Sequence, residues 1–174
     1  MCVHVQGEHY VKLSDFVLGK KLDAEYRHVC HLRQHRPAND DIWHLRFDWN
    51  TQRSEVIRNL RNKTFVFSPS KICQTQKGDR VENFDAIDAV VLKLIARLIT
   101  KEVRSKISPH VFNLKGKGGI KGALRCVLRH LTNFYFVFKT DIAKYYASIN
   151  HEILLDKLDK LGVSRYLIEL VQPH

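Results

Sequence analysis

Residues 134–155 read FYFVFKTDIAKYYASINHEILL. This stretch begins with an unbroken apolar and aromatic run, which is typical of a strand buried on both faces. We therefore predict a central strand over residues 135–140, with Asp141 at its end and Tyr146 one turn further along on the same open side. An aspartate at the end of a rigid strand is well placed for chemistry, although such residues more often serve turns or caps.

Helical patterns surround this stretch. Apolar residues recur at three- and four-residue steps over residues 85–98, which predicts a long amphipathic helix. A helix is also predicted over residues 22–35, and another begins where Thr51 can cap it. Near the end of the chain, Asn150 can cap a further helix that Gly162 would stop.

Two shorter patterns lie between the helix predicted after Thr51 and the helix predicted over residues 85–98. The aromatic and β-branched residues 65–67, followed by Ser68 and Pro69, favour a strand. The polar residues 76–79, which include a glycine, favour a turn. A short strand and a turn are therefore expected before the long helix.

Positive charge is concentrated between residues 100 and 130, where eight lysines and arginines stand against one acid, Glu102. Three of the cations fall at four-residue steps on a predicted helix with an apolar face, and so form one basic row. The glycines that precede this helix let backbone N–H groups approach phosphates closely, but they lack the spacing of a nucleotide P-loop. An exposed polar helix face beside a flexible loop is an equally simple interpretation. The cations of the predicted nucleic-acid surface are Lys115, Lys117, Lys121, Arg125 and Arg129.

The net charge of +11 favours a polyanionic partner, either nucleic acid or an anionic membrane surface. A membrane is the weaker option, because no apolar run approaches the roughly 20 residues needed to span a bilayer. The first twelve residues also lack the hydrophobic core of a signal peptide. We therefore expect a cytoplasmic protein with no membrane partner.

The four cysteines are scattered and form no CxxC pair, so neither a zinc ribbon nor a disulfide scaffold is indicated. Cys30 lies near His28, His31 and His35, but these residues do not have the spacing of a four-ligand zinc site. A basic, solvated helix surface is the favoured interpretation there.

Residues 138–155 resemble the first palm motif of reverse transcriptases of the bacterial, group II intron and retron type. That motif consists of Asp, Ile, two variable residues, two aromatics, then Ile, His and a pair of leucines, and all of these positions are filled here. Four upstream segments resemble the fingers motifs in the same order. The likeness runs from about residue 43 to residue 161, and the upstream segments are residues 67–69, 77–80, 88–93 and 115–119.

The resemblance implies an α/β or α+β fold made of polymerase fingers and an incomplete palm, helix-rich with a short mixed or antiparallel sheet. It divides the chain into an N-terminal helical extension, residues 1–42, and the fingers with the start of the palm, residues 43–174. It implies an RNA-directed DNA polymerase that performs template-dependent nucleotidyl transfer by a two-metal mechanism. Mg²⁺ would be the cofactor, and the partners would be an RNA template, a DNA primer and deoxynucleoside triphosphates.

The resemblance also implies roles for single residues. Asp141 matches the first metal-binding aspartate and the carbonyl of Ile142 matches a second ligand, which suits two-metal phosphoryl transfer. Tyr146 matches the aromatic that packs under the incoming sugar and excludes a ribose 2′-hydroxyl. Lys77 and Arg80 resemble the fingers cations that grip the triphosphate. The usual Arg-Pro-Leu and Ile-Pro continuation is replaced by Val-Glu-Asn at residues 81–83.

The sequence departs from the family at one decisive feature. No Tyr-x-Asp-Asp motif follows Asp141 within the 174 residues, and the pair Asp40-Asp41 precedes the fingers segments and cannot replace it. We therefore expect a fragment of the enzyme that is inactive alone. The alternatives are a non-catalytic nucleic-acid-binding module that uses residues 115–129, or an inactive remnant. Intron mobility, phage defence, diversity generation and retron synthesis all use this motif, so the biological role stays open.

Overall fold

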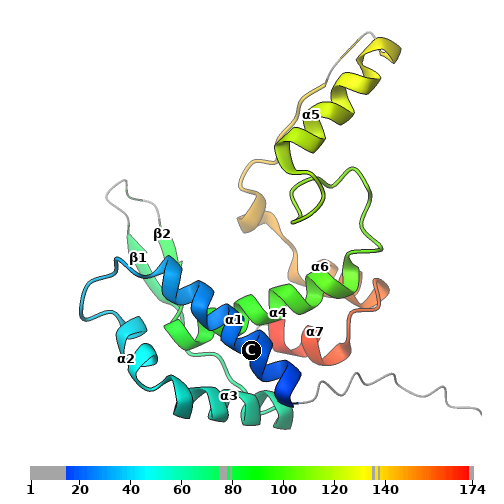
Figure 1. Ribbon diagram of the computed structural model, residues 1–174. Helices are drawn as coiled ribbons and strands as arrows, with labels where there is room; N and C mark the ends of the chain where they lie inside the picture. Colours follow the sequence, from blue (N-terminus) through cyan, green and yellow to red (C-terminus); the bar gives the residue numbers. More distant parts are fainter. Residues whose placement is uncertain (1–14, 75–77, 79, 135, 137, 173–174) are drawn as a thin grey trace, which may run out of the picture. The chain divides into compact units, whose positions relative to one another are not determined.

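The structure is a computed structural model of the 174-residue chain, and it describes residues 15–74, 78, 80–134, 136 and 138–172. The chain divides into two compact units, Met1–Arg97 and Leu98–His174 (Figure 1). Each unit is described by itself. The boundary predicted after residue 42 falls inside the first unit and stays a prediction.

The first unit consists of helices and one hairpin. Strands β1 and β2 pair antiparallel, with Lys71 opposite Asn83 and Gln74 opposite Arg80. The last helix, α4, continues into the second unit. The elements are α1 (Asp15–Leu32), α2 (Asp41–Phe47), α3 (Trp49–Asn62), β1 (Lys71–Gln74), β2 (Arg80–Asn83) and α4 (Ala86–Val103).

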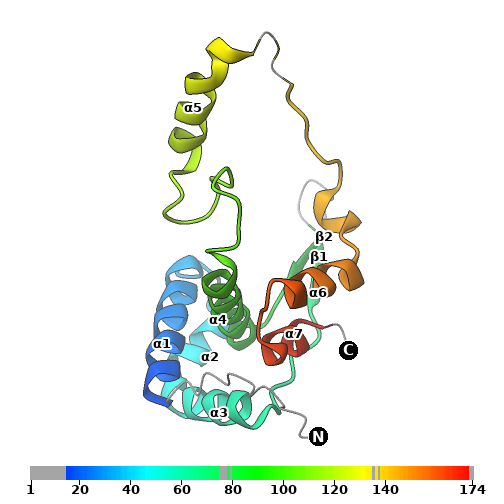
Figure 2. The ribbon, with the colours of Figure 1, turned by 90° about the vertical axis from the view of Figure 1, so that its right-hand side faces the viewer.

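The core of the first unit forms around α4, whose apolar residues recur at the predicted helical spacing. Helix α1 lies beside α4 in both views of the ribbon (Figures 1 and 2). Arg97 of α4 forms an ion pair with Glu25 of α1 at 2.6 Å, although the Glu25 side chain is only 2% exposed. The most deeply buried apolar residues are Leu22, Ile42, Val90, Val91, Leu94 and Ile95.

One charged pair joins three helices of this unit. The Arg33 guanidinium, just past the end of α1, donates to Oδ1 of Asp41 at 3.0 Å and to the carbonyl of Phe84 at 2.7 Å. The other oxygen of Asp41 accepts from the backbone N–H of Ala86 at 2.6 Å. Because Ala86 is the first residue of α4, Asp41 also satisfies one of the N–H groups that a helix start leaves unpaired. The pair therefore fixes the end of α1, the start of α2 and the start of α4.

A second polar contact joins α1 to α3. Asp23 accepts two hydrogen bonds from the Arg53 side chain, at 2.7 and 3.2 Å, and one from the Trp49 indole at 3.2 Å. The Trp49 ring also stacks on Tyr26, with centroids 3.9 Å apart and planes 7° apart. Bidentate pairing of this kind fixes orientation as well as distance.

The predicted strand over residues 65–67 is wrong, and the residue that follows it is held by the buried side chain of Asp88. The Asp88 side chain is 1% exposed and accepts a hydrogen bond from the backbone N–H of Ser68 at 2.9 Å. Burial raises the pKa of Asp88, and the bonds from Ser68 oppose that shift. Because this N–H bonds to a side chain and not to a neighbouring strand, pairing begins only at Lys71.

Periodicity placed the helices of this unit well and their ends less well. The long helix predicted over residues 85–98 is confirmed as α4. The helix predicted over residues 22–35 ends at Leu32, and the helix predicted after Thr51 begins at Trp49.

Among the described residues, the second unit contains the remainder of α4 and five further helical elements, two of them short 3-10 turns. Its buried apolar side chains among the described residues are Val103, Val163 and Leu167. The elements after α4 are α5 (Gly119–His130), η1 (Leu131–Asn133), η2 (Tyr145–Ser148), α6 (His151–Lys160) and α7 (Arg165–Val171).

The ends of α6 follow the prediction. The Asn150 side chain accepts from the backbone N–H of Ile153 at 3.1 Å, which caps the N-terminus. At the other end Gly162 has a φ of 67°, and its N–H donates to the carbonyl of Asp159 at 2.7 Å. The N–H of Val163 reaches the carbonyl of Leu158, which completes a Schellman motif.

The strand predicted over residues 135–140 is wrong for the residues of it that are described. Phe136, Phe138, Lys139 and Thr140 belong to no strand, and the two phenylalanines are 92% and 90% exposed. Tyr135 and Val137 lie outside the described residues. A strand needs a neighbour to pair its backbone groups, and β1 and β2 pair only with each other in the described sheet.

The described part of the chain is helix-rich with a short two-stranded antiparallel sheet, which confirms the coarse α+β class. Among these residues, no helix combines the length and the apolar character that crossing a membrane requires.

Replacing Asp41 with alanine should lower the free energy of unfolding by about 2–3 kcal/mol, because Arg33 loses its charged partner and Ala86 loses its acceptor. Urea denaturation measures the change. Asp156→Ala is the matched control, since Asp156 pairs with Lys160 on the exposed surface of α6. That control should cost no more than about 0.5 kcal/mol. Equal losses in the two variants would contradict the role given to Asp41.

Replacing Asp88 with asparagine should stabilise the chain at pH 7, because the amide can accept the same bond from Ser68 without an ionised group being buried. The pKa of Asp88 is raised in the folded chain, so the folded chain binds more protons than the unfolded chain between the two pKa values. The contribution of Asp88 to stability therefore falls as pH rises through that window. The advantage of Asp88→Asn should shrink as pH is lowered from neutral, and a pH series of urea denaturations measures it. A difference that does not change with pH would contradict this account.

Candidate functional site

The loop before α5 is folded against the first turn of that helix. The N–H of Gly119 donates to the carbonyl of Phe112 at 3.1 Å, and the N–H of Lys117 donates to that of Leu114 at 2.9 Å. Gly118 has a φ of 96°, and a Cβ there would lie 3.1 Å from the Cα of Gly122. Only glycine fits such a position without strain. The glycine entrance is therefore a defined turn.

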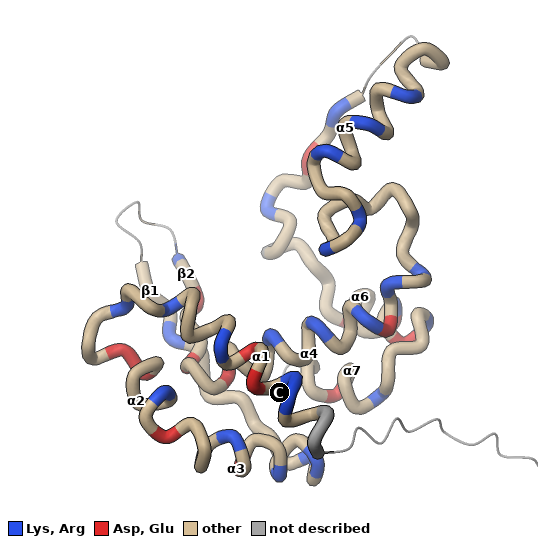
Figure 3. The backbone as a smooth tube through the Cα atoms, in the orientation of Figure 1, with Lys and Arg blue, Asp and Glu red and all other residues tan. Residues whose placement is uncertain are grey.

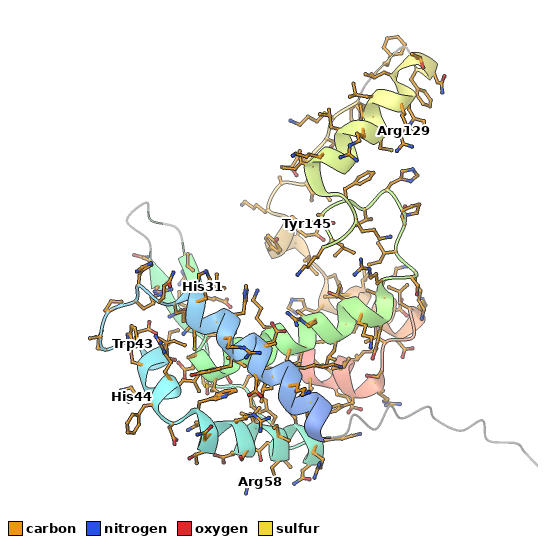
Figure 4. The ribbon with its side chains drawn as sticks, viewed as in Figure 1. His31, Trp43, His44, Arg58, Arg129 and Tyr145 are labelled. Carbon is orange, nitrogen blue, oxygen red and sulfur yellow. The ribbon has the colours of Figure 1, made fainter. Side chains whose placement is uncertain are left out.

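The basic row follows α5 as the sequence predicts. Lys121, Arg125 and Arg129 are all exposed, and Figure 3 shows Lys and Arg along this helix. The Arg129 side chain, labelled in Figure 4, donates to the carbonyl of Arg125 at 3.3 Å. Among the described residues no salt bridge joins these three cations to an acid. Lys115 is exposed and Lys117 half-buried in the preceding loop.

Helix α5 lies within a long stretch of sequence that carries positive charges and no acids. From residue 103 to residue 140 the sequence contains eight lysines and arginines and no acid. Cations that face no acid on their own element remain available to phosphates. The surface is thus suited to a polyanion.

Asp141 is exposed, and its Oδ1 accepts a hydrogen bond from the backbone N–H of Ile142 at 2.9 Å. The other oxygen of the Asp141 carboxylate and the carbonyl of Ile142 take no part in this bond. The resemblance to the palm motif implies that the carboxylate and this carbonyl bind a metal ion. Mg²⁺ often binds through one or two carboxylates while keeping waters and substrate phosphates. One carboxylate and one carbonyl would leave most coordination positions of such an ion to waters and phosphates.

The two tyrosines of the motif stand at the start of η2. Tyr146 is 87% exposed and packs edge-to-face on Tyr145, with ring centroids 5.3 Å apart. Tyr145 is labelled in Figure 4. Lys144, which precedes them, has a left-handed φ of 52°, a conformation that costs an ordinary residue about 1–2 kcal/mol. Both exposed rings therefore directly follow a residue in a strained backbone conformation.

The predicted fingers cations belong to the first unit. Arg80 is exposed at the start of β2, across from Gln74 in the hairpin. Lys77 lies outside the described residues. Arg80 and Asp141 are in different units, so the structure describes their surroundings separately.

Among the described residues no three His, Cys, Asp or Glu side chains come together in a way that could hold a metal ion. His28, His31 and His35 are exposed, and Cys30 is half-buried. This agrees with a basic helix surface in that region.

Sequence reasoning missed the polar network of the first unit. Asp40 caps α2 by accepting from the N–H of Ile42 at 3.1 Å, and an Asp before an apolar run is a recognisable helix start. Trp43 donates to the carbonyl of Pro37 at 2.9 Å and lies 4.9 Å from the Arg46 guanidinium (Figure 4). Both aspartates of the pair Asp40-Asp41 thus accept hydrogen bonds from backbone N–H groups at helix starts.

Comparisons with protein-family models, with curated proteins and with solved structures found no match to this chain.

Proposed function

We propose that this chain is part of an RNA-directed DNA polymerase, comprising the fingers and the start of the palm of a reverse transcriptase. The observation that carries the proposal is the segment from Asp141 to α6. It combines an exposed aspartate, two outward tyrosines and a helix capped by Asn150, in the order of the first palm motif. The setting would be the cytoplasm, with no membrane partner.

The proposed partners are an RNA template, a DNA primer and deoxynucleoside triphosphates. The exposed cations of α5 and its glycine entrance support the template contact, because phosphate contacts supply most of the affinity in such complexes. Tyr146 would lie against the sugar of the incoming nucleotide. Lys77 and Arg80 would contact its triphosphate.

Mg²⁺ is the proposed cofactor, held by the carboxylate of Asp141 and the carbonyl of Ile142. Bound there, it would polarise phosphoryl oxygens and neutralise developing charge. Two such ions roughly 4 Å apart need several carboxylate oxygens to offset their mutual repulsion. Asp141 alone does not provide them.

A second candidate function is a non-catalytic nucleic-acid-binding module. The run of residues 103–140 without an acid favours it, since this surface can bind a polyanion whatever Asp141 does. The two functions differ in what Asp141→Asn changes. Under the polymerase proposal that variant loses synthesis in a completed enzyme and keeps template binding.

We expect the chain to bind single-stranded RNA and primer–template duplex weakly and with a strong dependence on salt. A plot of log K against log salt has a slope of about −0.9 per phosphate contact on duplex DNA and about −0.7 on single strands. Arg125→Gln should reduce the slope by about one such contact. Fluorescence anisotropy over a salt series measures this.

Arg58→Gln is the control for that measurement, since Arg58 is an exposed arginine of α3 and the variant removes the same charge. It should leave the slope unchanged. A flat salt response of the unaltered chain, or equal changes in the two variants, would exclude α5 as the binding surface.

The 174 residues alone should not extend a primer, because one carboxylate cannot hold the charges that stabilise the transferring phosphoryl group. Primer extension with Mg²⁺ or Mn²⁺ and all four deoxynucleotides tests this. Fusion to the remaining palm of a reverse transcriptase of the same type, including Tyr-x-Asp-Asp, should give extension that Asp141→Asn abolishes. Extension by the unfused chain would refute the carboxylate argument. A folded but inactive fusion would count against the polymerase proposal.

A further inference from the structure

Helix α5 exposes its apolar face as well as its basic row. Five aliphatic side chains line one side of the helix and its continuation into η1, and none of the residues of α5 is buried. We call these five residues the apolar stripe. They are Ile120 at 89% exposed, Leu124 at 58%, Val127 at 49%, Leu128 at 56% and Leu131 at 42%.

The spacing of the apolar stripe is nearly symmetric about its midpoint. If the helix is paired with an antiparallel copy of itself, Ile120 falls opposite Leu131 and Leu124 falls opposite Val127. Leu128 then falls opposite the small apolar Ala123. A two-fold axis demands such self-complementarity, because each copy offers the same patch to the other. An antiparallel pair of α5 helices would also oppose their dipoles.

The exposed apolar area of this region is close to what a dimer interface requires. Phe134, Phe136 and Phe138 follow the stripe and are 65%, 92% and 90% exposed. The eight side chains together expose on the order of 800 Å² per copy, which is comparable to the area that each partner buries in a standard interface.

The charge of α5 determines how salt should act on such a pair. The helix carries Lys121, Arg125 and Arg129 and no acid, so two copies repel each other through their basic rows. Salt screens that repulsion and also favours apolar burial. Association between copies should therefore tighten as salt rises. Binding of an acidic peptide, an anionic vesicle or a nucleic acid to α5 would instead weaken as salt rises.

From these features we infer that the apolar stripe is a dimer interface, where α5 of one copy packs antiparallel against α5 of a second copy. Near the two-fold axis Arg125 lies close to its equivalent in the partner, and the flanking cations lie on one side of the paired helices. The inference does not depend on the proposed function.

Sedimentation velocity over a concentration series, at low and at high sodium chloride, tests the dimer. The full 174-residue chain should show a reversible monomer–dimer equilibrium that tightens several-fold at high salt. Leu124→Gln and the double change Leu124→Gln with Leu128→Gln should weaken it at least tenfold while the helix content stays the same, since these side chains are exposed in the monomer. Arg125→Gln should tighten the dimer at low salt and reduce its salt dependence.

Phe47→Gln is the matched control, because Phe47 is 95% exposed on α2 of the first unit. It should leave the dimer unchanged. A chain that stays monomeric at every concentration, or forms only polydisperse aggregates, overturns the inference. So does a dimer that the stripe variants leave intact. A monomer that binds phosphatidylglycerol vesicles or single-stranded RNA through Leu124 would assign the stripe to those partners and also overturn it.

Discussion

The charged pair between Arg33 and Asp41 is the interaction on which the first unit depends. The Arg33 side chain is only 11% exposed, so a loss of Asp41 would leave a mostly buried charge without its main partner. Asp41 in turn holds the first N–H of α4, the helix that supplies much of the core. Two residues separate the hairpin that carries Arg80 from α4. The first of them is Phe84, whose carbonyl accepts a hydrogen bond from Arg33. Arg33 and Asp41 therefore hold both the segment that leaves the hairpin and the start of α4.

The second unit has a different balance between core and surface. Its described residues bury only three apolar side chains, Val103, Val163 and Leu167, while α5 and α6 bury none. The hydrophobic effect favours burial of the apolar side chains that α5 and α6 expose. The apolar stripe and the basic row on α5 are thus two faces of one helix, and we assign them to two kinds of partner. Pairing of the stripes would leave both basic rows exposed to a polyanion.

Local signals predicted much of this fold. Apolar spacing gave α4 and α5, and the side chain of Asn150 with the backbone freedom of Gly162 gave both ends of α6, because each depends on residues within a few positions. The strand predictions were wrong because strands depend on distant residues. Residues 65–67 and 135–140 have strand composition, but a strand exists only when another strand pairs with it, and composition does not report the partner. The Arg33–Asp41–Ala86 contact was missed because it joins residues far apart in the chain.

The candidate site was predicted only as a set of residues. Asp141 and Tyr146 are both exposed, but the strand expected before Asp141 is wrong for its described residues, and the left-handed Lys144 between the two was not predicted. We propose above all that Asp141 binds the catalytic metal. Paramagnetic broadening by Mn²⁺ tests it most directly, in the ¹⁵N-labelled chain with a deoxynucleoside triphosphate and a primer–template. Broadening should centre on the amides of Asp141, Ile142 and Lys144 and disappear in Asp141→Asn. Broadening centred elsewhere, such as at Asp40 and Asp41, or unchanged in that variant, would contradict it.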